Sequence, residues 1–373
     1  MLSEPAISVS QEPLLGGPGG TEPGPGAASR APRSWRSLLR WETALVFCLV
    51  ATLIYGAGVP HFMSSTNIFY IGINMGEIAI MALPLTLIIM TGEIDLSVAS
   101  MLGLSSTLLG YLFKHGWPIA LAMVVVLIVG AAGGALNGFL VTKMKLPSIA
   151  VTIGTLTLYR GIAEIILGTG SVTGFPSSLT KIGVVPIAHT KLSYSIGIFL
   201  VLAVVFAVVL HATPVGRSIF AIGLQSEAAH FSGIRVERIK FTLFVLSGLI
   251  CSFAGILWTL RFATSRFDAG TGLELTVVTI VLFGGVSIFG GRGSIVGVVL
   301  AVVIVGCIQE ALTLKNVAAE VQNIVTGALL LISVIVPNSA DGIQRLRARS
   351  RGRARRRAQL RPTDLATTTT TER

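Results

Sequence analysis

The chain has 373 residues, of which 52% are apolar and only 12% charged, and its formal net charge is +11. A soluble domain carries about 25% charged residues, so this composition excludes an ordinary water-soluble protein. The apolar residues form continuous runs near the ~20 residues that span a bilayer as a helix, without the alternation of a spanning β-barrel strand. The sequence therefore predicts an all-α, polytopic bundle of transmembrane helices.

The excess basic charge lies in the tails and short loops, with no aromatic residues among it. This pattern favours an effect on membrane orientation over nucleic-acid binding. Cys48, Cys251 and Cys307 lie inside apolar runs without paired spacing, so we interpret them as packing residues. The histidines are scattered, and no Walker A pattern occurs, so we expect no metal, no cofactor and no ATP hydrolysis by this chain.

Three segments follow one another along the chain. Residues 1–40, rich in Gly, Pro and Ser, predict a disordered cytoplasmic lead, and 341–373 predict a disordered, Arg-rich cytoplasmic tail. Residues 41–340 form the expected transmembrane domain, which includes the loop 213–240. Its ten apolar runs lie near 43–60, 68–90, 94–113, 118–142, 146–167, 193–212, 241–262, 274–290, 293–312 and 319–337.

The fourth run contains four closely spaced glycines, Gly130, Gly133, Gly134 and Gly138. Small residues at such spacing let helix backbones approach closely in lipid. We therefore expect a packed bundle and not a set of independent anchors.

The orientation follows from the distribution of Lys and Arg. With ten crossings and an internal N-terminus, 21 of these residues fall on the inside and 6 on the outside. Cytoplasmic loops carry such an excess. Both termini are therefore predicted to be cytoplasmic.

Polar and charged residues inside apolar runs are the candidates for a solute path or gate, because each is costly in hydrocarbon. Glu77 has no basic partner on its own helix and precedes Pro84, which should break or kink that helix. Arg160 and Glu164 are four residues apart and can neutralise each other on one helix face.

Asn137 also lies within a run, and Gln309 and Glu310 lie near the end of another. Asp95, just before the third run, is either a solute-path residue or simply a helix cap. Pairing and packing remain open as alternative explanations for this whole group of polar residues.

The longest inside loop, 213–240, begins with Pro214 and Gly216. It contains a short helical patch that Gly233 ends, and small alanines in this patch offer a surface for another protein. The candidate docking residues are Glu227, Ala228, Ala229, Ser232, Gly233 and Ile234. An ordinary connecting loop is the alternative.

Motifs in a specific order give the chain a resemblance to a known family. They are Thr91-Gly-Glu-Ile-Asp-Leu-Ser97, Gly134-Ala-Leu-Asn-Gly138, Lys145-Leu-Pro147, Thr152-Ile-Gly-Thr155, Arg160-Gly161, Ala221-Ile-Gly223, Glu227-Ala-Ala229, Ser232-Gly-Ile234, Gly284-Gly285 and Gly290-Gly-Arg-Gly-Ser294. Across about residues 66–337 the chain resembles permease subunits of bacterial ABC importers of the ribose/xylose/arabinose/galactoside type. Its details are most similar to permeases for rhamnose or autoinducer-2.

The resemblance implies a non-catalytic subunit in the bacterial plasma membrane. Its implied partners are a cytoplasmic ATP-binding subunit on the loop around Glu227–Ile234, an external solute-binding protein and a second permease subunit. In one motif the family usually has two glycines where this chain has Gly92 and Glu93, which questions the geometry of that turn. A proton- or sodium-coupled transporter that uses Glu77, and a receptor-like membrane protein, remain as alternatives.

Overall fold

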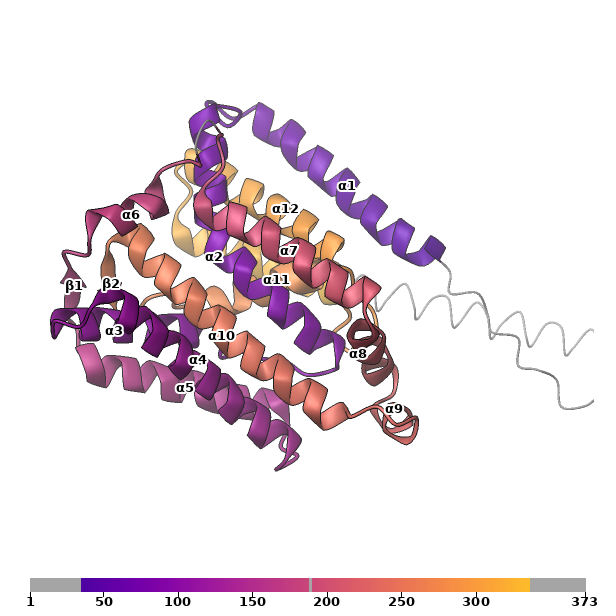
Figure 1. Ribbon diagram of the computed structural model, residues 1–373. Coiled ribbons are helices and arrows are strands. Elements are labelled where there is room, and N and C mark those ends of the chain that lie inside the picture. Colours follow the sequence, from indigo (N-terminus) through magenta and orange to yellow (C-terminus); the bar gives the residue numbers. More distant parts are fainter. Residues whose placement is uncertain (1–34, 188–189, 336–373) are drawn as a thin grey trace, which may run out of the picture.

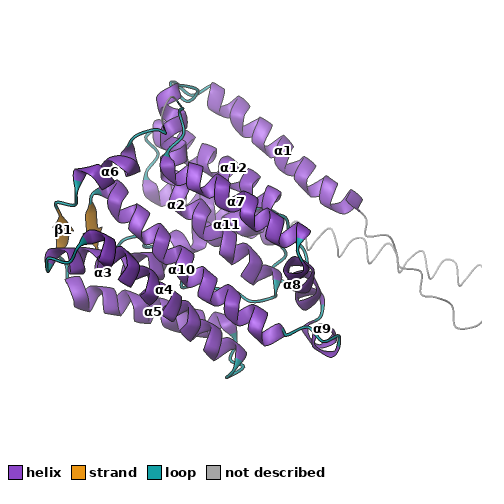
Figure 2. Ribbon diagram, in the orientation of Figure 1, coloured by secondary structure: helices purple, strands orange, loops and turns teal. Residues whose placement is uncertain are grey.

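The computed structural model describes residues 35–187 and 190–335, and these are almost entirely helical (Figures 1 and 2). The labelled helices are α1 (Trp35–Ala57), α2 (Ser65–Met90), α3 (Val98–Lys114), α4 (Ile119–Thr142), α5 (Ser148–Leu167), α6 (Ser177–Val184), α7 (Tyr194–Ala212), α8 (Pro214–Leu224), α9 (Ser226–Phe231), α10 (Val236–Phe262), α11 (Leu273–Phe283) and α12 (Ile295–Leu314). A helix over Ala319–Ile335 follows them. Two short strands, β1 (Ser171–Thr173) and β2 (Thr264–Arg266), pair antiparallel at one edge of the bundle.

Helix α2 passes through the centre of the bundle, where it contacts α7, α10, α11 and α12. In its most apolar stretch 94% of the residues are buried, whereas α4, α5 and α7 each bury less than a third of theirs. Residues 75–91 are all buried. The continuous apolar character of α2 therefore matches contact with protein on every side, and the exposed apolar faces of the outer helices match contact with lipid.

The glycines of α4 bring this helix close to α10, as their spacing predicts. A side chain at Gly134 would collide with the backbone carbonyl of Phe244, and one at Gly130 would collide with Ser252 and the carbonyl of Gly248. The two backbones therefore touch, which is how small residues allow helices to associate in lipid. The expected close packing is confirmed.

Six helices are long and apolar enough to cross a membrane, namely α2, α4, α5, α7, α10 and α12. The remaining predicted runs also contain helices, but α1, α3, α11 and Ala319–Ile335 have shorter apolar stretches. The polytopic helical bundle is thus observed, while the count of ten spans and the side of the termini stay predictions.

One expected boundary, at glycine, and one expected helix break, at proline, differ from the structure. The run 274–290 is not one helix, because α11 ends at Phe283 and Gly284 is followed by Gly285 in the left-handed region, with φ of 86°. Conversely, Pro84 does not break α2, which continues to Met90. Proline lacks the amide hydrogen that would bond the Ile80 carbonyl, and packing on every side compensates for that loss.

The N-terminal boundary also differs slightly, because α1 begins at Trp35, within the predicted lead. The rest of the lead, 1–34, and the predicted tail lie outside the described residues. Their assignments stay predictions.

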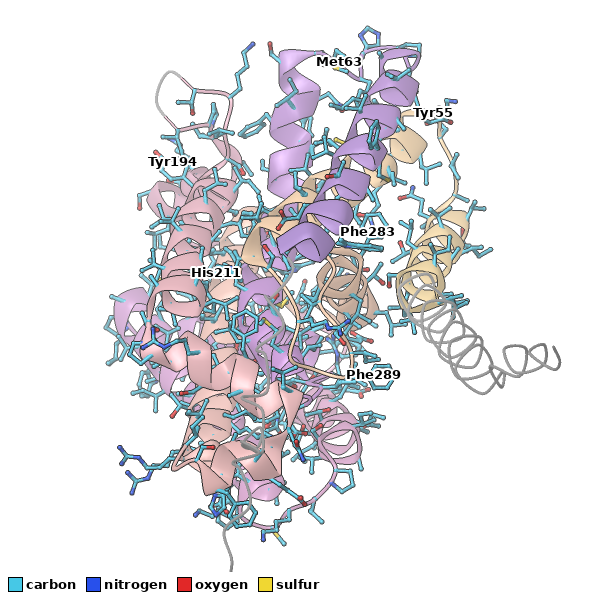
Figure 3. All side chains as sticks on the ribbon, turned by 90° about the vertical axis from the view of Figure 1, so that its right-hand side faces the viewer. Tyr55, Met63, Tyr194, His211, Phe283 and Phe289 are labelled. Carbon is cyan, nitrogen blue, oxygen red and sulfur yellow. The ribbon has the colours of Figure 1, made fainter. Side chains whose placement is uncertain are left out.

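The two ends of the bundle carry different elements. At one, which we call the α9 end, α8 and α9 lie with the loops 91–97 and 284–294; β1, β2 and α6 lie at the other, the strand end (Figure 1). In Figure 3, Met63 between α1 and α2 lies at the top of the view, and Phe289 in the loop 284–294 lies in the lower half. Under the predicted orientation the α9 end would face the cytoplasm.

Candidate functional site

Helices α8 and α9 form the candidate docking surface within residues 213–240. Thr213 caps α8, since its Oγ1 accepts a hydrogen bond from the Gly216 amide, and Pro214 occupies the first helical turn. The extended residue Gln225 separates the two helices, and Gly233, with φ of 84°, redirects the chain before α10. The local sequence therefore builds a short helix that projects between two turns.

The side chains of this segment divide into an anchored set and a free set. Ala229 is buried against Ile222 and Val236 and fixes α9 to the bundle. Phe231, at the end of α9, is 88% exposed. The other predicted docking residues are exposed (Glu227, Ala228, Ser232 and Gly233) or half-buried (Ile234). The segment therefore exposes the aromatic ring of Phe231 beside polar and small side chains, while Ala229 anchors it to the bundle.

Helix α8 lies directly on the end of the central helix. A side chain at Gly223 would collide with the carbonyl oxygen of Met90 and with the amide of Gly291. That same amide donates a hydrogen bond of 2.9 Å to the Met90 carbonyl. Glycine at 223 is thus what allows α8, the end of α2 and the loop 284–294 to meet backbone to backbone.

Glu93, the residue that departs from the resemblance, has a definite partner. Its Oε1 lies 2.5 Å from Nζ of Lys240 in α10, and the two side chains are only 18% and 14% exposed. Gly92 keeps the left-handed turn, with φ of 83°. The extra carboxylate therefore ties the loop after α2 to the helix that follows the docking segment.

Glu77 is fully buried and ion-paired across helices. Its Oε2 accepts a hydrogen bond of 2.9 Å from Nη1 of Arg261 at the end of α10, and its Oε1 accepts one from Ser195 in α7. Arg261 also donates to the carbonyl of Ile73 and to Oδ1 of Asn74. The partner that Glu77 lacks on its own helix thus comes from another one.

Asp95 and Asn137, predicted separately, belong to one hydrogen-bonded cluster. Oδ1 of Asp95 accepts hydrogen bonds from the amide (3.0 Å) and hydroxyl (2.6 Å) of Ser97, and Oδ2 accepts one from Ser247 (2.9 Å). Nδ2 of Asn137 donates to the Ser97 hydroxyl at 2.9 Å. None of the ion pairs among the described residues includes Asp95.

The N-cap of α3 is Ser97, two residues after Asp95. The expectation that Asp95 caps this helix is therefore wrong. Its short side chain instead bonds to the backbone of the turn that precedes the helix.

Arg160 and Glu164 do not form the expected pair. Arg160 donates from Nη1 to the carbonyl of Ala269 (2.6 Å) and from Nη2 to that of Ala99 (3.3 Å). Glu164 is exposed on α5, and the ion pairs of the described residues do not include it. Backbone carbonyls from α3 and the loop after β2 satisfy the guanidinium in place of a carboxylate.

The residues that sequence reasoning missed are the partners. Arg261 and Lys240 were counted only as loop charges, and Ser195 and Ser247 carried no signal in their apolar runs. Arg261 lies 184 positions from Glu77 along the chain. Such contacts follow from the fold and cannot be found from local spacing.

Comparison with known proteins gives a consistent result. Residues 67–334 match the family described as "Branched-chain amino acid transport system / permease component". The autoinducer 2 import system permease protein LsrD of Escherichia coli strain K12 is 35% identical over 304 residues, which cover 79% of this chain and 91% of that protein. LsrD of Shigella flexneri gives the same values, and LsrD of Escherichia coli O157:H7 is 34% identical. No solved structure matches.

The match covers the bundle from α2 into the last described helix, together with the docking surface and the buried residues Glu77, Asp95 and Asn137. The resemblance to ABC importer permeases is confirmed, and six helices of the matched region are long and apolar enough to span a membrane. This chain is a membrane transport protein and belongs to the family of branched-chain amino acid transport system permease components.

Proposed function

We propose that this chain is the membrane-spanning subunit of an ABC importer for a small, sugar-like solute of the autoinducer-2 or rhamnose class. A separate ATP-binding subunit would dock on α8 and α9 in the cytoplasm. An external solute-binding protein would deliver the solute at the strand end, and a second permease subunit would complete the path through the bacterial plasma membrane.

The observation that carries this proposal is the position of α8 on the central helix. The exposed face of α9 can receive another protein, while Gly223 brings α8 against the Met90 carbonyl at the end of α2. A push on this segment would therefore reach the middle of the bundle through backbone contacts.

The way in which two buried carboxylates are held fits a polar, uncharged solute. Glu77 is matched by Arg261, and Asp95 is held by hydroxyl groups. Because Glu77 already has a basic partner, it has less reason to serve as the acid of a proton- or sodium-coupled transporter. The similarity to LsrD, an autoinducer 2 import permease, supports the solute class.

The test replaces two exposed docking residues. Glu227→Lys reverses a charge on α9, and Gly233→Pro cannot adopt the positive φ of the turn after it. We expect both variants to insert normally, to lose most of the co-purifying ATP-binding subunit and to lose ATP-dependent uptake in proteoliposomes. Glu320→Lys, the same change at an exposed glutamate after α12, is the matched control and should behave like the unaltered chain.

Normal co-purification of both docking variants would refute the docking assignment. Uptake that needs no ATP-binding subunit and collapses with an uncoupler alone would instead support the ion-coupled alternative. A chain that transports nothing, even with its partners supplied, would support the receptor-like one.

A further inference from the structure

A cavity of about 240 Å³ opens in the half of the bundle nearer the strand end. Residues of α2, α10, α11, α12 and the helix Ala319–Ile335 line it. A water molecule occupies about 30 Å³ in the liquid, so the cavity has room for about eight, close to the size of a monosaccharide. Its lining is amphipathic, because it combines the apolar side chains of Met75, Ile78, Leu273 and Trp258 with the polar ones of Asn74, Arg261, Gln309, Glu310 and Gln322.

The two charged groups at this cavity are engaged to different degrees. Arg261 is held by the Ile73 carbonyl, Asn74 and Glu77, so its charge is matched by a buried carboxylate. Glu310 has one hydrogen-bond partner among the described residues, Asn74, whose Nδ2 lies 3.3 Å from Oε2. Glu310 therefore supplies a carboxylate with accepting capacity left over and no basic partner of its own among the described ion pairs.

Trp258 contributes an aromatic ring to the cavity lining, and neighbouring side chains hold this ring in place. The guanidinium of Arg261 lies 5.7 Å from the centre of its ring and 4.6 Å from that of Phe262. This cation–π contact and the ion pair to Glu77 hold Arg261 and the indole together. The C–H face of a sugar packs well on an aromatic ring, while its hydroxyls seek carboxylate and amide groups.

We propose that this cavity is a solute-contact site of the permease itself, and that it selects a neutral, polyhydroxylated solute of monosaccharide size over a phosphorylated one. Glu310 accepts hydroxyl hydrogens, Trp258 stacks on the C–H face, and the Asn74–Arg261–Glu77 chain fixes both walls. The unmatched carboxylate disfavours an anionic sugar. The inference rests on the proposed function and adds to it a discrimination made within the membrane subunit.

The experiment measures protection of a cysteine at the cavity. In the full-length chain with Cys48, Cys251 and Cys307 replaced by Ala, Thr313→Cys places a thiol on the cavity wall, and Glu320→Cys places one at an exposed position that is not part of the lining. Proteoliposomes are treated with a membrane-impermeant maleimide, without ATP or partner proteins. The probes are L-rhamnose, D-ribose and D-ribose 5-phosphate.

We expect the two neutral sugars to slow labelling of the cavity cysteine and to leave the control cysteine unchanged, and we expect D-ribose 5-phosphate to give weaker protection. Glu310→Gln should raise the sugar concentration for half-protection about tenfold, as for the loss of one charge-assisted hydrogen bond. The same variant should also reduce the difference in protection between D-ribose and D-ribose 5-phosphate. Trp258→Leu should weaken protection by neutral sugars without reducing the difference in protection between ribose and its phosphate.

Equal protection by ribose and its phosphate would overturn the proposal. The proposal would also fail if the cavity cysteine is labelled at the same rate with or without sugar, or is never labelled. It would fail as well if Glu310→Gln and Trp258→Leu both leave protection unchanged. If uptake depends on the ATP-binding subunit while no sugar protects, the cavity assignment fails alone. If protection holds while uptake needs no such subunit, the proposed function fails and the cavity assignment stands.

Discussion

Two buried carboxylates in this bundle are stabilised by different means. Glu77, in the half nearer the strand end, is paired with Arg261 and bonded to Ser195. Asp95, nearer the α9 end, receives only hydrogen bonds from Ser97 and Ser247. The first arrangement joins α2 to α10 through formal charges and to α7 through the Ser195 hydroxyl. The second joins the loop 91–97 to α10 through the Ser247 hydroxyl, and to α4 through the bond from Asn137 to Ser97.

The two carboxylates differ in how much stability the protein should lose when one of their partners is removed. Removing one member of a buried ion pair strands an uncompensated charge, which costs far more than the pair contributes when intact. Removing a hydroxyl from the Asp95 cluster costs one hydrogen bond, because other donors remain. The half of the bundle nearer the strand end should therefore be brittle to single substitutions, and the opposite half tolerant.

The largest effect should come from Arg261→Leu. It leaves Glu77 unpaired in the interior, and we expect a loss of about 3–5 kcal/mol in the free energy of unfolding. Unfolding is followed in lipid–detergent micelles by the reactivity of the buried Cys307 thiol toward a fluorescent maleimide. Arg266→Leu, which breaks the exposed pair with Asp268, is the matched control and should change little. Equal stability of the two variants would contradict the expectation that the buried ion pair matters more than the exposed one.

Asp95→Asn should have a smaller effect. The amide keeps the size of the side chain, but its NH₂ group replaces an oxygen that accepted a hydrogen bond. We therefore expect a loss of about 1–3 kcal/mol in the free energy of unfolding, by the same measurement. A loss as large as that of Arg261→Leu would show that the hydroxyl cluster is no more tolerant than the ion pair.

Ser247→Ala sharpens the comparison within the cluster. It removes the donor to Oδ2 of Asp95 and leaves both bonds from Ser97, so the expected loss is about 1 kcal/mol. Ser252→Ala, on the same helix, removes a hydroxyl that donates only to the Gly248 carbonyl and serves as the control. Comparable losses in the two variants would mean that Asp95 gains nothing particular from Ser247.

The smallest effect on stability is expected from Glu93→Gln, which weakens the half-buried pair with Lys240. We expect a change of about 1 kcal/mol or less, because the two side chains keep partial access to solvent. If this pair couples the loop after α2 to α10, the helix that follows the docking surface, ATP hydrolysis by the transporter assembled with this variant should respond less to solute. Unchanged coupling, measured as the ratio of solute-stimulated to basal hydrolysis, would restrict Glu93 to a local role.

These contrasts also show what the sequence could and could not provide. Apolar runs and α4 glycines predicted the helical bundle and its close packing, because spanning length and small-residue contacts are properties of a single segment. Pro214, the small alanines and Gly233 predicted a short helix between turns in the loop 213–240, and its role in docking stays a prediction. Local spacing also suggested a pair between Arg160 and Glu164, which the structure does not form.

The missing part is the choice of partners across helices. Arg261 meets Glu77 only after α10 packs beside α2, and nothing in the neighbourhood of either residue signals it. The cavity around Trp258 and Glu310 likewise draws on five helices. The sequence therefore identified Glu77 as a charge that is costly to bury, but only the fold shows that Arg261 compensates this charge.

From Met75 to Met90, α2 is buried on every side, and this stretch forms a continuous link between the α9 end and the cavity. Met90, against α8, and Asn74, at the cavity, are residues of one helix, separated by about 24 Å at 1.5 Å per residue. Work applied by a docked subunit would thus arrive at the solute without crossing a flexible linker. Pro84 lies between them, and because a backbone hydrogen bond is missing there, α2 would bend most easily at this residue. The direction of that bend would then set which side of the cavity opens.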